Sequence, residues 1–231
     1  MTTWGVALAG AAVAGVLGAR VPTLIARIPE PLTQPLTESA KEPYADVAAS
    51  PHLGRWTALV SAVAAGAVAL VLGPDRALVG WLPSIPVLVL LAVVDWRTRL
   101  LPRLVVLPVT GALLVLLLAE YAIWHDTRVL VRALVAMLMA RSVFWLLWFI
   151  RRAGMGFGDV RLAALIGLLL GRLGWQQWLL GLYGALIIFV LWGVGRALAL
   201  RSPAALRQAL PFGPFLALGA LAGALLGPAF S

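Results

Sequence analysis

Two acidic residues, Asp95 and Asp159, stand at the edges of apolar runs. Asp95 closes the run that begins at Ile85, and Asp159 ends the short sequence Gly156-Phe-Gly-Asp159. An ionised aspartate at the centre of a membrane helix costs about 2.5–3.5 kcal/mol on insertion scales, so acids in membrane segments are functional candidates by default. Two carboxylates held close together share a proton, and one then activates water while the other polarises a carbonyl group.

Each acid also has a plain structural interpretation, which the residues alone leave open. At a membrane edge, Asp95 is compatible with an ion pair to Arg97 or Arg99. Asp159 is compatible with the role of a helix N-cap, which aspartate often fills.

Composition indicates a membrane protein. Hydrophobic residues make up 62% of the 231 residues, charged residues only 12%, and the mean hydropathy is +1.00. No soluble domain has this balance. The formal net charge of +9 comes almost wholly from arginines between apolar runs. This pattern indicates membrane topology and contact with a lipid bilayer, with no nucleic acid partner.

Other residue types with chemical potential are few. The chain contains no cysteine, which excludes disulfides, thiolate zinc sites and a cysteine nucleophile. His52 and His125 lie in loop-like stretches, so neither a His-based metal centre nor a Ser–His triad is expected. Glu120 and Asp126 are expected to be solvated loop charges. We therefore predict no metal site and no cofactor.

The elements that position the two acids are expected to be helices. The fold class is all-α, a polytopic transmembrane bundle, because the length allows about eight spans of roughly 20 residues each. The apolar runs predict spans at about residues 4–26, 56–73, 77–94, 104–124, 129–150, 160–173, 177–200 and 211–230. The proline-rich stretch 29–55 is expected to be an irregular loop with at most a short helix. We divide the chain into a reduced N-terminal region, residues 1–55, which holds the first span and this loop, and a membrane-embedded domain, residues 56–231.

The distribution of basic residues predicts the orientation. When loops are assigned alternately to two sides, the side richer in arginine is expected to be cytoplasmic. The rich side receives Arg20, Arg27, Lys41, Arg55, Arg97, Arg99, Arg103, Arg151, Arg152, Arg161, Arg196, Arg201 and Arg207, and the other side receives Arg76, Arg128, Arg132 and Arg172. Two spans separate Asp95 from Asp159, and two spans return the chain to its starting face. Both carboxylates are therefore expected at the cytoplasmic boundary, at similar depth.

Three motifs occur in the order found in one known family. The sequence Asp95-Trp-Arg-Thr-Arg-Leu-Leu-Pro102 resembles the first catalytic motif of the type IV prepilin leader peptidases. Gly156-Phe-Gly-Asp-Val-Arg-Leu162 resembles their GxGD motif, and Leu210-Pro-Phe-Gly-Pro-Phe-Leu-Ala-Leu-Gly219 resembles their C-terminal Pro-Phe-Gly-Pro segment. Three motifs in the right order are far more specific than any one of them.

The resemblance implies a function and a place in the cell. It implies a multi-pass aspartic endopeptidase of the inner membrane, which cleaves the basic leader from prepilins or pseudopilins at the cytoplasmic face. Residues 56–231 would then be the peptidase domain. Asp95 and Asp159 would be the catalytic pair, and Gly156 and Gly158 would shape the active-site loop.

The chain also departs from the family pattern. Arg103 stands where the family often has asparagine, and Arg161 replaces the usual lysine. Larger members carry two Cys-x-x-Cys pairs in a segment that goes with N-methylation of the product. This chain resembles a short form without those cysteines, which weighs against methyl transfer.

Rival interpretations use the same two acids. A presenilin-like intramembrane protease also has a GxGD motif, but places tyrosine before its first aspartate, where this chain has Val94. A proton- or cation-coupled transporter would need the acids nearer the midplane, on a continuous path. A noncatalytic assembly factor would use both aspartates as helix caps.

Overall fold

The computed structural model describes residues 2–30, 42–150, 156–202 and 211–230. Its elements are α1 (Thr3–Ala19), α2 (Val21–Ile25), α3 (Tyr44–Ala48), α4 (Leu53–Leu72), α5 (Leu78–Thr98), α6 (Arg103–Trp124), α7 (Thr127–Ile150), α8 (Phe157–Leu173), α9 (Trp175–Ala199), α10 (Gly213–Leu226) and a 3₁₀ turn (Gly227–Phe230). These described ranges contain no strand, and the all-α expectation is confirmed. Four of the basic residues used to predict orientation, Lys41, Arg151, Arg152 and Arg207, lie outside the described residues.

The helices make a multi-pass membrane protein. In the described part of the chain, five helices are long and apolar enough to cross a membrane, namely α4, α5, α6, α7 and α9. The apolar helices α1 and α10 are shorter, and α8 has 17 residues. Each expected apolar segment contains a helix, whereas the number of spans and the domain division at residue 55 stay predictions.

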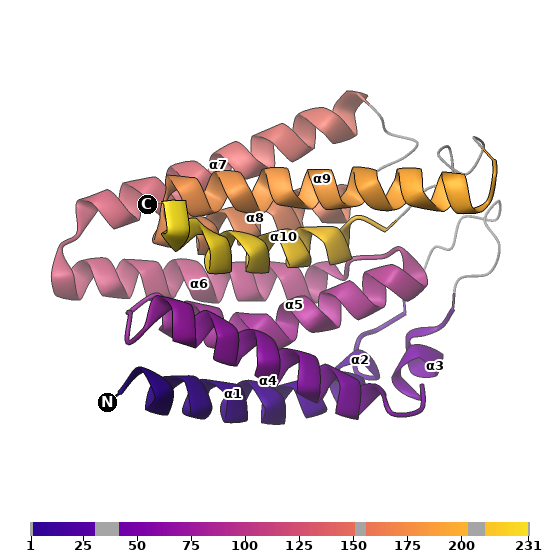
Figure 1. The fold of residues 1–231 in the computed structure, drawn as a ribbon, viewed down its shortest axis with the longest axis horizontal. Coiled ribbons are helices and arrows are strands. Elements are labelled where there is room, and N and C mark those ends of the chain that lie inside the picture. Colours follow the sequence, from indigo (N-terminus) through magenta and orange to yellow (C-terminus); the bar gives the residue numbers. More distant parts are fainter. Residues whose placement is uncertain (1, 31–41, 151–155, 203–210, 231) are drawn as a thin grey trace.

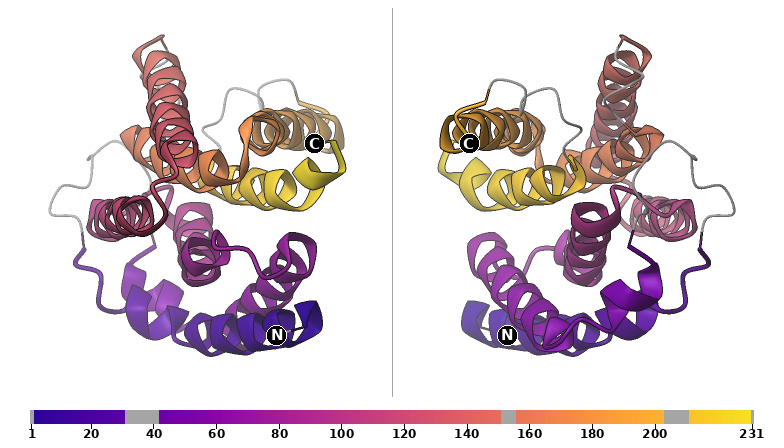
Figure 2. Two further views of the ribbon diagram at one scale, coloured as in Figure 1. Left: turned by 90° about the vertical axis from the view of Figure 1, so that its left-hand side faces the viewer. Right: turned by 90° about the vertical axis from the view of Figure 1, so that its right-hand side faces the viewer.

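The helices run roughly along one axis, so that their ends form two faces (Figure 1). Both chain ends lie at one face, together with the turns that join α4 to α5, α6 to α7 and α8 to α9. The opposite face holds the end of α5, the start of α8 and the start of α10. Seen along the axis, α1 and α4 lie on one side, α7 and α9 on the other, and the remaining long helices between them (Figure 2).

Helix α8 is the central element of the second half of the chain. From Asp159 to Arg172, every side chain except that of Arg161 is buried, as expected for a helix that is apolar on all faces. Its Gly167 and Gly171 admit α7 at backbone contact. A Cβ atom on Gly171 would lie 2.5 Å from the Cβ atom of Ala136. Small residues allow membrane helices to approach this closely, so α8 has a tightly defined position.

Helix α5 continues beyond its predicted end at residue 94. The helix runs to Thr98, whose Oγ1 donates a hydrogen bond of 2.8 Å to the carbonyl of Val94. Arg99 then ends it in the left-handed conformation, with φ of 54°, and its N–H donates to the carbonyl of Asp95. Asp95 therefore lies inside the last helical turn, where its backbone is held by regular hydrogen bonds.

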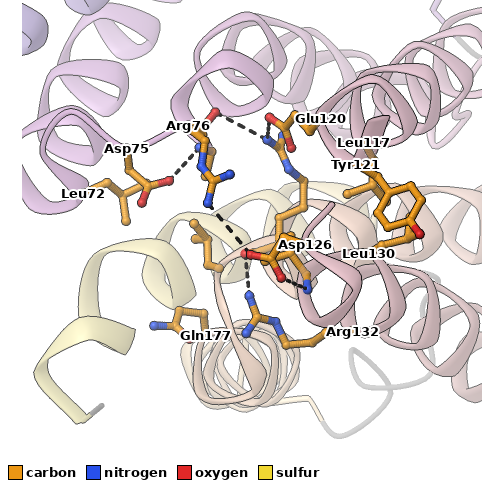
Figure 3. Close-up of a pocket in the computed structure, with 14 residues that line it drawn as sticks. Leu72, Asp75, Arg76, Leu117, Glu120, Tyr121, Asp126, Leu130, Arg132 and Gln177 are labelled. Atoms are coloured by element: carbon orange, nitrogen blue, oxygen red, sulfur yellow. Dashed lines mark hydrogen bonds and ion pairs between the residues drawn. The ribbon is translucent and has the colours of Figure 1, made fainter. Parts of the chain in front are cut away.

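A polar cluster holds the other end of α8, around a cavity of about 240 Å³. Figure 3 shows Arg76, Glu120, Asp126 and Arg132 directed toward this cavity from different elements. Arg172 belongs to the same cluster, with a side chain only 1% exposed, and its Nη2 donates to the carboxylate of Glu120. The expectation that Glu120 is a solvated loop charge is wrong, because α6 brings this carboxylate against a buried guanidinium.

Replacement of Glu120 by alanine is expected to destabilise the fold strongly. In Glu120→Ala the Arg172 guanidinium stays buried without its carboxylate, and breaking a buried pair on one side costs about 3–5 kcal/mol. The matched control is Glu42→Ala, because the pair between Glu42 and Arg97 is solvent-exposed and such pairs contribute about 0–1 kcal/mol. Unfolding in detergent micelles measures both variants. Equal losses of stability would contradict a structural role for the buried pair.

Candidate active site

Asp95 is held by the start of a helix that lies far away in the sequence. The residue is 4% exposed, and its Oδ2 accepts a hydrogen bond of 2.7 Å from the backbone N–H of Gly213, the first residue of α10. A Cβ atom on Gly213 would lie 2.8 Å from that same Oδ2. Only glycine therefore leaves room for the carboxylate at this position, and the start of α10 orients Asp95.

Asp159 occupies the third position of α8 and is 7% exposed. The N-cap of this helix is Gly156, so the interpretation of Asp159 as an N-cap is wrong. Instead, the backbone N–H of Asp159 donates a hydrogen bond of 3.1 Å to the carbonyl of Gly156 in the first turn of α8. A carboxylate in the first turn also lies at the positive end of the helix dipole, which favours the anion.

The two carboxyl groups lie close enough to interact electrostatically. They come from α5 and α8, and α10 packs against both of these helices. Two acids that are mostly shielded from water and near each other do not both ionise readily, and an arrangement of this kind favours a state in which the two acids hold one proton between them. A pair in this state has one group able to accept a proton and one able to donate.

The glycine that precedes Asp159 brings the two acid-bearing segments together. A Cβ atom on Gly158 would lie 2.6 Å from the Cβ atom of Leu101, in the segment that follows Asp95. Gly156 has more space, since a Cβ atom there would be 3.8 Å from Oδ2 of Asp159. Close packing of α8 on the segment after α5 therefore depends on Gly158 more than on Gly156.

Arg97 is not the partner of Asp95. Its guanidinium makes two hydrogen bonds, of 2.7 and 2.6 Å, to the carboxylate of Glu42. The hydrogen bond and the charge of Arg97 lower the pKa of Glu42. Arg99 acts on Asp95 electrostatically. The hydrogen bond that orients the Asp95 carboxylate comes from the Gly213 backbone.

Aromatic side chains surround the start of α10. Phe215 packs edge-on against Phe189, with ring centroids 5.3 Å apart, and lies 6.5 Å from the ring of Trp96. Phe212 packs edge-on against Phe189 at 4.7 Å. These contacts join α5, α9 and α10 next to Gly213. The aromatic packing thus fixes the backbone that donates to Asp95.

The structure brings together the four site residues singled out in the sequence, Asp95, Asp159, Gly156 and Gly158. Sequence reasoning assigned no individual role to Gly213, which has no side chain with chemical potential and lies 118 residues from Asp95. The only signal for it was the Pro-Phe-Gly-Pro motif. Within the described ranges, no cluster of three or more His, Cys, Asp or Glu residues is placed to bind a metal ion.

Comparison with known proteins identifies related sequences. Residues 83–194, which include Asp95 and Asp159, match the model of the type IV leader peptidase family. A protein of Aeromonas salmonicida named prepilin leader peptidase/N-methyltransferase is 32% identical over 173 residues, which cover 74% of this chain and 56% of that protein. A protein of the same name from Burkholderia pseudomallei is 32% identical over 73% of this chain and 53% of its own length.

A third relative of that name, from Pseudomonas putida, is 34% identical over 61% of this chain and 47% of its own length. The chain thus spans about half the length of these curated relatives. No solved structure matches it. Through residues 83–194, the chain belongs to the type IV leader peptidase family.

Proposed function

We propose that this chain is a membrane aspartic endopeptidase that removes the basic leader from type IV prepilins or pseudopilins. Asp95 and Asp159 are the catalytic pair in this proposal, and Gly156 and Gly158 shape the loop beside them. The names of the relatives support the reaction and the class of substrate. The segment matched by the family model contains all four of these residues.

One observation carries the proposal. The carboxyl groups of Asp95 and Asp159 are both buried and interact electrostatically, although 64 positions separate them in the numbering of the chain. Buried acids of like charge are unfavourable unless one holds a proton, and such perturbed acids cluster at functional sites. Neither the ion pair with Arg97 nor the N-cap role explains this arrangement.

The reaction follows from one shared proton. The ionised carboxylate takes a proton from water as the water oxygen bonds to the scissile carbonyl carbon, and the protonated partner gives its proton to the carbonyl oxygen. The tetrahedral intermediate then collapses. The C–N bond breaks, a proton moves to the leaving amine, and the pair again holds one proton. The N–H of Gly213 keeps the Asp95 carboxylate in a fixed orientation throughout.

The arginines near Asp95 and Asp159 support the proposal that the protein lies in the inner membrane with its active site facing the cytoplasm. Arg97, Arg99 and Arg103 follow Asp95 closely, and Arg161 follows Asp159. Positively charged segments stay on the cytoplasmic side of a membrane. The same placement disfavours a transporter, because both acids lie in terminal helical turns and not near the middle of a span.

Co-expression with a prepilin-like substrate tests the proposal. The substrate is expected to lose its basic leader, seen as faster migration on a gel, with the cut just before its apolar helix. A substrate that stays whole beside well-expressed enzyme would contradict the proposal. The absence of cysteine weighs against methyl transfer, and mass spectrometry of the product N-terminus in the same assay measures whether a methyl group is added.

A further inference from the structure

An apolar groove of about 450 Å³ opens between α4, α5 and α10. Small side chains, Ala92 of α5 and Ala217 of α10, line it between larger ones such as Val60 of α4 and Leu218 of α10. Val60 and Leu218 are 47% and 51% exposed, so the groove is open to the surroundings of the bundle. For a membrane-spanning bundle those surroundings are lipid.

The groove reaches the turn of α5 that carries Asp95 and the start of α10. At one end it is lined by Trp96, which follows Asp95, and by Pro214, which follows Gly213. Gly213 is the residue whose N–H donates to Asp95. Along α5 the lining extends from Ile85 to Arg97, a length of about 18 Å at 1.5 Å per residue. About three helical turns of another chain fit this length.

The chemistry of the lining selects the occupant. Thr57 and Arg97 are its polar residues, and both are already engaged. Thr57 donates to the carbonyls of Gly18 and Leu53, and Arg97 binds Glu42. An extended peptide would leave its backbone groups unsatisfied in such a site, whereas a helix bonds its own backbone internally. The small residues Ala92 and Ala217 allow a helix to approach closely.

We propose that this groove seats the apolar helix of the substrate, so that the peptide bond before that helix reaches Asp95 and Asp159. This inference rests on the proposed function and adds where the substrate binds. The position of the groove favours a substrate helix over a lipid chain, because a helix in this groove ends at Trp96 and Pro214, the chain neighbours of Asp95 and Gly213. Recognition then depends on packing along α4, α5 and α10.

Disulfide crosslinking tests the groove directly, since the chain has no cysteine of its own. Single cysteines are placed at Val60 and Leu218 in the groove, and at Val115 of α6 as the matched control. Val115 is 67% exposed and does not line the groove. The chain also carries Asp159→Asn to keep the substrate whole. The substrate carries one cysteine, moved stepwise along its apolar helix, and oxidation is done in membranes.

Crosslinks are expected from Val60→Cys and Leu218→Cys at substrate positions three or four residues apart, and not from Val115→Cys. Crosslinking from Val115→Cys that equals that from the groove positions, or that lacks helical periodicity, would overturn the inference and indicate that the groove holds only lipid. In the otherwise unmodified chain, Val60→Trp is expected to slow cleavage about tenfold by filling the groove, whereas Val115→Trp leaves the rate unchanged.

The crosslinking result distinguishes a failure of the proposed substrate-binding groove from a failure of the proposed catalytic pair. Crosslinking does not require cleavage, so it reports on the groove even if the catalytic assignment is wrong. A chain with Asp159→Asn that still cuts the substrate would contradict the catalytic pair. If the groove variants crosslink weakly while Asp159→Asn abolishes cleavage, the result contradicts substrate binding in the groove and leaves the catalytic pair unaffected.

Discussion

Asp95→Asn and Asp159→Asn are each expected to lower the rate of leader cleavage by at least about 10²–10⁴-fold, the usual contribution of a positioned acid or base. Asparagine has nearly the same shape as aspartate but neither accepts the proton of water nor donates a proton to the carbonyl oxygen. In Asp95→Asn the amide oxygen can still accept from Gly213, so the backbone arrangement is preserved. The loss is therefore expected in the chemical step and not in folding.

The double variant sharpens this prediction. Residues that act as one unit are grossly non-additive, so Asp95→Asn with Asp159→Asn is expected to be no slower than the slower single variant. The control is Asp126→Asn, which alters a carboxylate in the turn between α6 and α7, a turn that lies at the opposite face of the bundle (Figure 1). Its cleavage rate is expected to stay near that of the parent chain. Cleavage that survives both single substitutions would end the hypothesis of a catalytic pair.

Gly213→Ala has the second large expected effect. The new Cβ atom would lie 2.8 Å from Oδ2 of Asp95 and 3.1 Å from its Cβ and Cγ atoms. The carboxyl group or the start of α10 must shift, and a displacement of about 1 Å at a reacting group costs roughly 10²-fold in rate. The turnover rate is expected to fall more than substrate binding weakens, because the groove is left in place.

Gly184→Ala provides the matched control for this substitution. Gly184 lies within α9, and nothing stands within 4 Å of the position that its Cβ atom would take. Alanine there is expected to leave cleavage unchanged and to stabilise the helix by up to about 1 kcal/mol. Cleavage by Gly213→Ala as fast as by Gly184→Ala would show that Gly213 does not position Asp95. Melting of both variants in detergent separates a misplaced carboxylate from general unfolding.

The helices were largely predictable because hydropathy is a local property of the chain. Each apolar run contains a helix, and the two spans between Asp95 and Asp159 return the chain to one face, as the parity argument requires. The predicted positions of the helix ends were less accurate. Helix α5 extends to Thr98 because Thr98 and Arg99 make local hydrogen bonds that a hydropathy pattern does not contain.

Charged residues outside the proposed site were harder to place. Glu120 lies near the end of an apolar run, yet it pairs with Arg172, which lies 52 positions away. A charge near the end of an apolar run is solvated or buried depending on which helix packs beside it. The sequence of a single run does not contain that information.

By itself, the sequence determined the all-α class, the order of the helices and the common face of the two acids, because apolar runs and span parity are read along one dimension. Only the tertiary structure decided that both carboxyl groups are buried and that Gly213 orients one of them. The physical reason is that such contacts depend on the rotation of each helix and on how closely its neighbours approach. Both depend on small residues at close contacts, such as Gly171 against Ala136 of α7 and Gly158 against Leu101 in the segment after α5.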